Sequence, residues 1–303
     1  MWFIFSLLTA LAWGGADLFY KKGSDSNDKY SHIKIIIMVG LVMGIHATAY
    51  MIIKDIQFNP MEMIHYLPVS SLYILSMAFG YIGLRYIELS IASPIQNSSG
   101  VVTSILLFIF FTHELSIIEV LGIIIITLGI VGIAVLEKRA EDEVRRLNSE
   151  HIDKKYQIGF LAIIFPILYC IIDGLATFAD AIYLDELNLI SENSALLAYE
   201  YTFFLCAAVC FIYLRFIKKE SFHVFKERDK GIAAILETIG QFFYVFAMAS
   251  GYAIIAAPLI ASYSIFSIIL SRIFLKEKLT KKQYMIIAVV IFGIILLGIA
   301  DEL

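Results

Sequence analysis

The sequence predicts an all-α integral membrane protein with ten transmembrane helices, arranged as two inverted five-helix repeats. Of the 303 residues, 60% are hydrophobic and 17% are charged, and the mean hydropathy is +0.84. A soluble domain has about 45–50% apolar and about 25% charged residues. The apolar residues also gather in long runs, and the two halves of the chain resemble each other at a fixed offset. The solvent for most of the surface is therefore lipid.

Ten apolar runs are long enough to cross a bilayer as helices, because a hydrocarbon core of about 30 Å needs about 20 residues. Within lipid, only helices and closed barrels satisfy every backbone N–H and C=O group. Barrel strands would alternate apolar and polar residues, whereas a stretch such as 121–136 is continuously apolar, so helices are predicted. The runs, in chain order, are 2–20, 33–53, 66–86, 91–111, 116–136, 156–180, 194–217, 229–250, 254–274 and 280–300.

Short polar turns separate most of these runs, and the longest polar connection, 137–156, lies near the midpoint of the chain. We therefore predict a first five-helix repeat at 1–137, a charged cytoplasmic connector at 138–155 and a second five-helix repeat at 156–303. The first run lacks the basic segment and the small-residue cleavage site of a signal peptide. It also has a counterpart in the second half, so we interpret it as a membrane helix.

The repeat is visible as polar and proline matches at two related offsets. A shift of 164 residues aligns the fourth and fifth runs with the ninth and tenth, and Pro94 then meets Pro258. A shift of 156 aligns the first run with the sixth, and Asp17 then meets Asp173. Because five is an odd number, the two units must have opposite orientations in the membrane. Inverted repeats are a recurring transporter architecture, with the substrate bound near the midplane.

The basic residues mark one side of the membrane. All 23 Lys and Arg residues except Lys54 lie in or beside the connections that follow odd-numbered runs. The positive-inside rule makes that side cytoplasmic, which predicts a multi-pass plasma-membrane protein with both termini outside.

The net charge of -4, without a cluster of basic residues, excludes a nucleic-acid partner. The three cysteines lie in apolar runs and indicate neither a disulfide framework nor a metal cluster.

Short motifs in both halves resemble those of a known family. Trp13-Gly14 in the first run, and an acidic residue shortly before Leu-Ser at 115–116 and Leu-Thr at 279–280, are similar to EamA-type carriers of the drug/metabolite transporter superfamily. This resemblance covers the whole chain and implies a ten-helix secondary carrier of small metabolites or drugs. Related four-helix exporters use a first-helix carboxylate for protons and cations, and Asp17 lies in a comparable place. Described family members usually have cytosolic termini, unlike the orientation that the charges predict here.

Acidic residues inside the runs are the candidate functional groups: Asp17, Asp173, Asp180, Glu200 and Glu237. No Lys or Arg lies near the middle of any run. An ionisable side chain at mid-membrane costs about 2.5–3.5 kcal/mol or more and usually has a function. An acid without a basic partner must hold a proton, bind a cation or reach water, and each option suits a proton- or cation-coupled carrier. Two alternatives stay open: Asp180 in a loop at the membrane surface, and Glu200 in contact with water.

Helical spacing places aromatic rings on the same face as these acids. Trp13 precedes Asp17 by four residues, and Tyr169 precedes Asp173 by the same number. Carboxylates beside aromatic rings attract ammonium groups by charge and by cation–π interaction. We predict a cavity for a small cationic or zwitterionic substrate, in which Asp17 and Asp173 also bind the coupled proton. The predicted substrate-binding residues are Trp13, Asp17, Gln96, Asn97, Tyr169, Asp173, Glu200, Glu237, Gln241, Tyr244 and Tyr263.

Simpler interpretations fit several other residues. Tyr20 lies at the end of a run, where aromatic residues are typical of the membrane interface. Pro94 and Pro258, near the starts of the fourth and ninth runs, suit an early turn of a helix and need no function. His46 is interpreted as a hydrogen-bonded interior histidine.

The predicted function is secondary active transport of a small amine-bearing metabolite by alternating access, coupled to protons or cations. The sequence contains no phosphate-binding loop, catalytic triad or metal-ligand cluster, so we predict no enzyme activity, no cofactor and no metal. The predicted partners are the substrate, protons and the bilayer, with a homodimer left open. Two alternatives remain: a lipid-handling membrane protein and a non-transporting scaffold.

Overall fold

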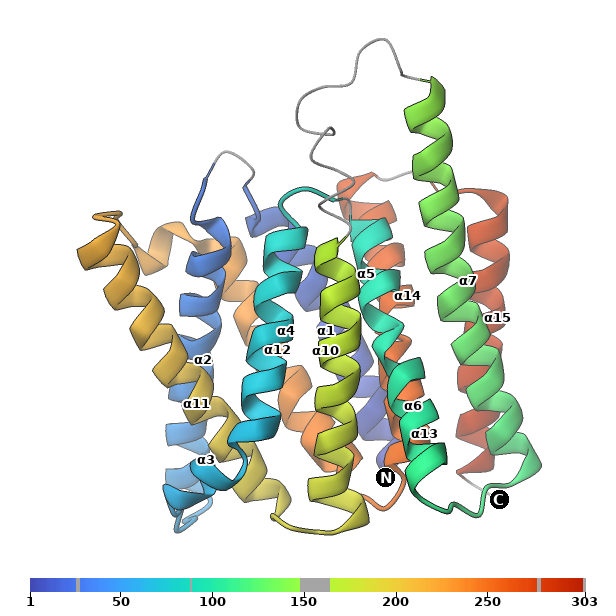
Figure 1. Cartoon of the computed structure of the whole chain (residues 1–303), viewed down its shortest axis with the longest axis horizontal. Helices are drawn as coiled ribbons and strands as arrows, with labels where there is room; N and C mark the ends of the chain where they lie inside the picture. The colour runs from blue at the N-terminus through green and yellow to red at the C-terminus, as the bar shows by residue number, and fades with distance from the viewer. Residues whose placement is uncertain (26–27, 88, 148–163, 277–278, 302–303) are drawn as a thin grey trace.

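The computed structural model describes the chain except for residues 26–27, 88, 148–163, 277–278 and 302–303 (Figure 1). Among the described residues, nine helical segments are long and apolar enough to cross a membrane, and α4 (Leu67–Gly83) is a shorter apolar helix. The prediction of an all-helical membrane protein with about ten spans is confirmed. The remaining helices of the first half are α1 (Trp2–Gly23), α2 (Ser31–Ile53), α3 (Met61–His65), α5 (Leu89–Asn97), α6 (Ser99–Phe110) and α7 (Ile117–Leu147).

The second half begins, within the described residues, at α10. Its elements are α10 (Ile164–Ala181), η1 (Ile182–Glu186), α11 (Glu192–Ile212), η2 (Tyr213–Ile217), η3 (Val224–Lys226), α12 (Arg228–Met248), α13 (Ala253–Ala261), α14 (Tyr263–Leu270), η4 (Ser271–Leu275) and α15 (Lys281–Ala300). Helix α15 starts with a capping box, in which Thr280 and Gln283 satisfy each other's backbone N–H groups.

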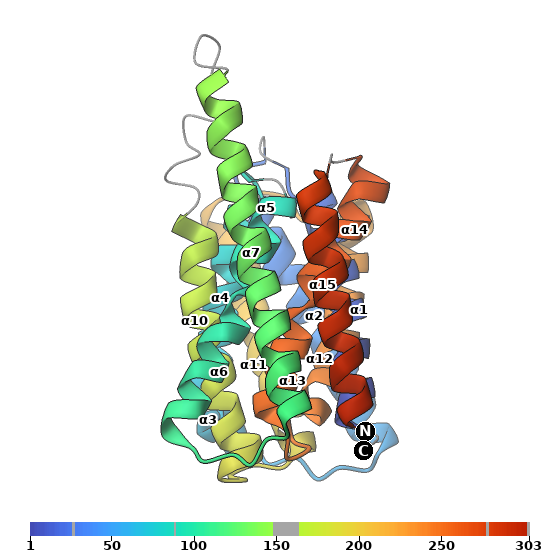
Figure 2. The same cartoon turned by 90° about the vertical axis from the view of Figure 1, so that its right-hand side faces the viewer.

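Helix α7 does not end with its apolar run but continues to Leu147, so it extends beyond the other helices in Figures 1 and 2. Its last turns are rich in Ala, Glu, Arg and Leu, which are strong helix formers, and contain neither Gly nor Pro. The first part of the predicted connector, 138–155, is therefore helical. Residues 148–163, with the predicted start of the second repeat at 156, lie outside the described residues.

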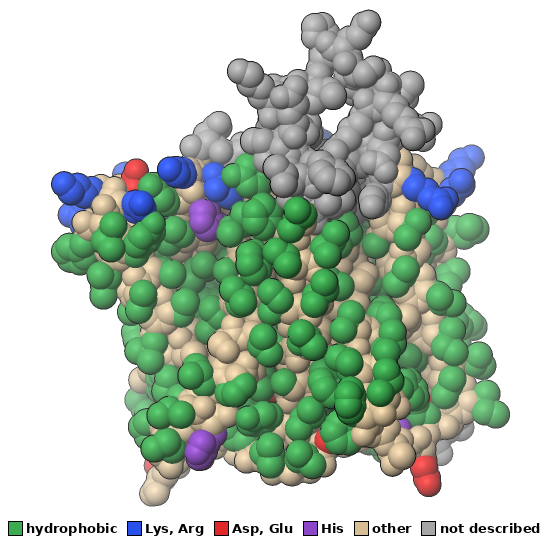
Figure 3. Space-filling view, viewed as in Figure 1, with side chains coloured by type: hydrophobic (Ala, Val, Ile, Leu, Met, Phe, Trp, Pro, Cys, Tyr) green, Lys and Arg blue, Asp and Glu red, His purple; other side chains and the backbone are tan. Residues whose placement is uncertain are grey.

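The two repeats interleave through equivalent contacts. Helix α1 packs against α12 and α14, while its counterpart α10 packs against α4 and α6. Helix α2 pairs with α11, and α7 with α15. Helix α1 starts at the end of the molecule where both termini lie and α10 ends there, so the two repeats have opposite orientations (Figure 1). On the face seen in Figure 3, the Lys and Arg side chains gather at the opposite end.

The fourth and ninth spans are each broken into two helices at matching positions. The helix is interrupted at Ser98 between α5 and α6, and at Ser262 between α13 and α14. Pro94 and Pro258 lie inside the preceding helices, α5 and α13, one turn before each break. Proline has no N–H to donate, and both serine hydroxyls donate to carbonyls of the preceding turn, an arrangement that often bends helices. The breaks leave polar groups available at the centre of the bundle.

Candidate substrate cavity

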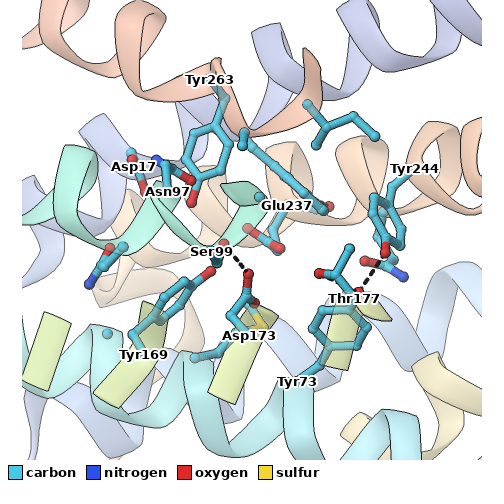
Figure 4. A pocket seen from close by; sticks show the side chains of 18 of the residues that line it. Asp17, Tyr73, Asn97, Ser99, Tyr169, Asp173, Thr177, Glu237, Tyr244 and Tyr263 are labelled. Carbon is cyan, nitrogen blue, oxygen red and sulfur yellow. Dashed lines mark hydrogen bonds between the residues drawn. The ribbon is translucent and has the colours of Figure 1, made fainter. Parts of the chain in front are cut away.

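A cavity lies between the two repeats, at the breaks in the fourth and ninth spans (Figure 4). Its walls come from α1, α4, α5, α6, α10, α11, α12, α13 and α14. The centres of water molecules can occupy a volume of about 60 Å³ inside it. This is room for only a few waters, because one water needs about 10–15 Å³ by this measure. The structure therefore shows a narrow cavity.

The predicted substrate residues converge on this cavity, with one exception. The cavity is lined by Trp13, Asp17, Gln96, Asn97, Tyr169, Asp173, Glu237, Gln241, Tyr244 and Tyr263, but not by Glu200. These residues come from both halves of the chain.

Asp17 in α1 is held by serines of the two broken spans. Ser93 of α5 and Ser267 of α14 each donate a hydrogen bond of 2.7 Å to its Oδ2. Asn97 donates to Ser93 Oγ at 3.1 Å and so orients that hydroxyl. The Asp17 side chain is buried but still lines the cavity.

Asp173, the equivalent acid of the second repeat, has a similar environment built from different elements. Ser99 of α6 donates to its Oδ2 at 2.8 Å, and Ser76 of α4 donates to Oδ1 at 3.2 Å (Figure 4). A serine hydroxyl can donate to a carboxylate and can accept from a protonated acid. Both acids can therefore exist with or without a proton in the same geometry.

Glu237 is the third carboxylate of the cavity, and its contact to the protein is weaker. Tyr20 donates to its Oε2 at 3.5 Å. Beside it, Trp13 stacks on Tyr244 with ring centroids 5.2 Å apart and meets Tyr263 edge-on at 5.7 Å. No Lys, Arg or His is among the described residues that line the cavity. Three acids and several aromatic rings thus face a cavity without a basic side chain.

Several lining residues were not predicted. Tyr20 is buried against the cavity, so its interpretation as an interface residue is wrong. Tyr73, Met77 and Tyr81 of α4 also line the cavity. Their spacing of four residues places them on one face of a helix, and this was the signal that could have identified them. Tyrosine is common at membrane interfaces, however, so the composition of this run did not single them out.

Two further acids lie away from the cavity wall. Glu200 is fully buried in α11, where both carboxylate oxygens lie within 2.9 Å of Nδ1 of His46 in α2. His46 is therefore a hydrogen-bonded histidine, as expected. Asp180 is fully buried within α10, so the alternative that placed it in a surface loop is wrong. In the part of the chain that is described, no three His, Cys, Asp or Glu residues are placed to hold a metal ion.

Two inverted five-helix units around a central cavity define a class of membrane carriers. The sequence matches the model of the EamA-like transporter family over residues 1–135 and 160–299, and the chain belongs to this family. It is a family of transporters and not of enzymes, so the protein is a multi-pass membrane transporter. Family membership thereby favours transport over lipid handling and over a non-transporting scaffold.

The fold also recurs in solved structures, of which 27 chains match. One of them, described only as "Crystal structure of protein", superposes with a TM-score of 0.67 at 13% sequence identity. The match covers 99% of this chain and 96% of the other, so the likeness extends over the whole fold. A search of the curated proteins finds no match.

Proposed function

We propose that the protein is a secondary active transporter of a small amine-bearing metabolite, cationic or zwitterionic, that works by alternating access. The observation that carries the proposal is the set of charges in the cavity: Asp17, Asp173 and Glu237 line it, and no described lining residue is basic. In a site of low dielectric constant, unneutralised carboxylates attract a cation strongly. The rings of Trp13 and Tyr244 add cation–π attraction for an ammonium group.

The hydrogen bonds support a division of roles among the three acids. Asp17 and Asp173 each accept two serine hydroxyls, a setting that suits gain and loss of a proton. We therefore assign proton coupling, or cation exchange, to these two residues. Among the described residues, the Glu237 carboxylate has one long hydrogen bond, from Tyr20, which leaves it available to pair with the amine of the substrate.

The orientation in the membrane is part of the same proposal. We place the protein in the plasma membrane with its basic end in the cytoplasm and both termini outside, following the distribution of Lys and Arg. Ser191 and Ser221 are exposed, one near each end. In a chain without its native cysteines, an impermeant thiol reagent on intact cells should label Ser191→Cys, and should label Ser221→Cys only after permeabilisation. The reverse pattern would contradict this orientation.

Uptake into proteoliposomes tests the function itself. A panel of labelled amines, quaternary ammonium compounds, amino acids and nucleobases should include an amine with saturable, pH-dependent uptake. Asp17→Asn and Asp173→Asn should each abolish that uptake, because asparagine keeps the shape but carries neither charge nor exchangeable acid proton. Glu200→Gln is the matched control, since it removes a membrane-embedded carboxylate outside the cavity. Unchanged uptake and unchanged pH dependence in both aspartate variants would contradict the mechanism.

A further inference from the structure

A second buried polar cluster lies next to the cavity, toward the end of the molecule that carries the termini. Its centre is Asp180, which is fully buried and is not among the residues that line the cavity. The hydroxyl of Tyr66 donates to Asp180 Oδ1, and Tyr244 supplies the other hydroxyl beside this carboxyl; among the described residues Oδ2 has no hydrogen bond of good geometry. Thr177, on the same helix as Asp180, lines the cavity, so the cluster lies directly behind the cavity wall.

The groups around Asp180 do not neutralise a negative charge. The titratable side chains that interact with it are Tyr66, directly before α4, Tyr73 from α4, Tyr199 from α11 and Tyr244 from α12. The described residues of α5, α6, α13 and η1, which also pack against α10, contain no Lys, Arg or His, and η1 adds only the further acids Asp185 and Glu186 and the hydroxyl of Tyr183. A buried carboxylate that has only hydroxyl groups and no counter-charge beside it is strongly disfavoured. The neutral acid therefore fits the closed structure, and the ionised form requires water.

The hydroxyl groups next to Asp180 form a hydrogen-bonded wall of the cavity on this side. Tyr73 of α4 and Tyr244 of α12 have their hydroxyl oxygens 2.5 Å apart, and Tyr73 also donates to Thr177 of α10 at 3.0 Å (Figure 4). We call these three residues the terminal-side layer. They join three helices at the end of the cavity nearer the termini.

The other end of the cavity has a corresponding hydrogen-bonded wall. Tyr81 of α4 donates to Tyr20 of α1 at 3.1 Å, and Tyr20 contacts Glu237 of α12. This basic-side layer joins α1, α4 and α12, whereas the terminal-side layer joins α10, α12 and α4. The two sets are equivalent under the repeat, because α10 is the counterpart of α1 and α12 is the counterpart of α4. Each layer thus contains a hydrogen-bonded pair of tyrosines with a carboxylate beside it. Alternating access requires the two layers to open in turn.

We propose that Asp180 is a proton-binding site, separate from the substrate cavity, whose occupancy controls the terminal-side layer. With a proton bound, Asp180 stays buried behind Tyr66 and the layer is closed. When the proton leaves, the charge draws in water and the layer opens toward the end that carries the termini. The site takes a proton and not a metal ion, because Asp180 is a single carboxylate and no group of three His, Cys, Asp or Glu is placed to hold a metal within the described residues. This inference rests on the proposed function, since it concerns access to the same cavity.

The experiment measures access to the cavity and needs no substrate. In the full chain without native cysteines, Ala261→Cys places a thiol in the cavity wall. Reconstituted protein is treated with an impermeant thiol reagent across a range of pH, and the rate is divided by that of the exposed Ser191→Cys, which corrects for orientation and thiol reactivity. The corrected rate should rise with pH by up to about tenfold per pH unit, the limit for loss of one proton. In an Asp180→Asn background it should stay low at every pH.

Two further variants complete the test. Glu192→Gln removes an acid at the same end of the molecule and should keep the original pH profile. Tyr66→Phe removes the donor that stabilises the ionised form of Asp180, and should move the pH profile of labelling to higher pH. If Asp180→Asn does not fold, this variant tests whether Asp180 controls access. A rate independent of pH in the parent chain, a retained profile in Asp180→Asn, or an unmoved profile in Tyr66→Phe would overturn the proposal. Labelling uses no substrate, so a negative labelling result would overturn the role of Asp180 without affecting the uptake test of the proposed function. A negative uptake result would likewise leave the labelling test unaffected.

Discussion

The walls of the cavity and the α7–α15 pair both come from apolar membrane-span candidates but serve different purposes. The cavity walls carry carboxylates, serines and tyrosines at the breaks of two spans, whereas neither α7 nor α15 contributes a residue to the cavity. These two helices approach closely at glycines: a Cβ on Gly129 would lie 2.2 Å from Val290 Cγ2. In lipid, where apolar contact with a neighbour gains little over contact with acyl chains, close packing at small residues holds helices together. Substitutions in the two regions should therefore affect different properties.

The largest effect is expected from loss of a cavity charge. Glu237→Gln should weaken binding of the transported amine roughly 10- to 150-fold, since a hydrogen bond to a charged group contributes about 1.5–3 kcal/mol. Its thermal unfolding should change little, because the hydrogen bond found for the Glu237 carboxylate among the described residues is a long one, from Tyr20. Titration calorimetry with the amine identified by uptake, together with unfolding in detergent, measures both properties. A large loss of stability without loss of affinity would show that Glu237 serves packing and not binding of the amine.

The next effect is expected in the α7–α15 pair and concerns stability alone. Gly129→Ala should destabilise the fold by about 1–3 kcal/mol, the usual cost of overpacking, because its methyl group overlaps Val290. Gly132→Ala on the same helix is the matched control, since its nearest atom, Ile286 Cδ1, lies at 3.4 Å. Thermal unfolding should separate the two variants, while uptake per folded molecule stays unchanged in both. Equal stability of the two would show that this contact is not close.

The smallest effect is expected from the aromatic wall. Trp13→Leu keeps apolar bulk but removes the ring, and should weaken binding of an ammonium ligand about 2- to 5-fold, the equivalent of a cation–π contribution of about 0.5–1 kcal/mol. Phe292→Leu, on the exposed face of α15, removes an aromatic ring far from the cavity walls and should leave binding unchanged. Affinities for a quaternary ammonium compound and for an uncharged analogue of equal size provide the measurement. An equal loss for both compounds would exclude a cation–π role.

The candidate acids could be predicted because hydropathy makes them conspicuous. Asp17 and Asp173 interrupt apolar runs and match under the repeat, and both line the cavity. The tyrosines could not be singled out in the same way: Tyr73 and Tyr81 are amphipathic residues, and only their neighbours show whether a ring faces lipid, an interface or a cavity. The break at Ser98 was equally hidden, because a proline is compatible with either a first turn or a bend.

The sequence by itself determined the class of the protein, the number of crossings, the opposite orientation of the two halves and the acids available for chemistry. These follow from local rules, since a bilayer requires apolar runs of a set length and five crossings reverse the direction of the chain. Only the tertiary structure decided which acids meet. Asp17, Asp173 and Glu237 share one cavity, while Glu200 pairs with His46 and Asp180 lies behind a layer of tyrosines. The reason is that the rotation of each helix about its axis depends on contacts between distant segments, and in lipid an apolar helix has no polar face that would reveal it.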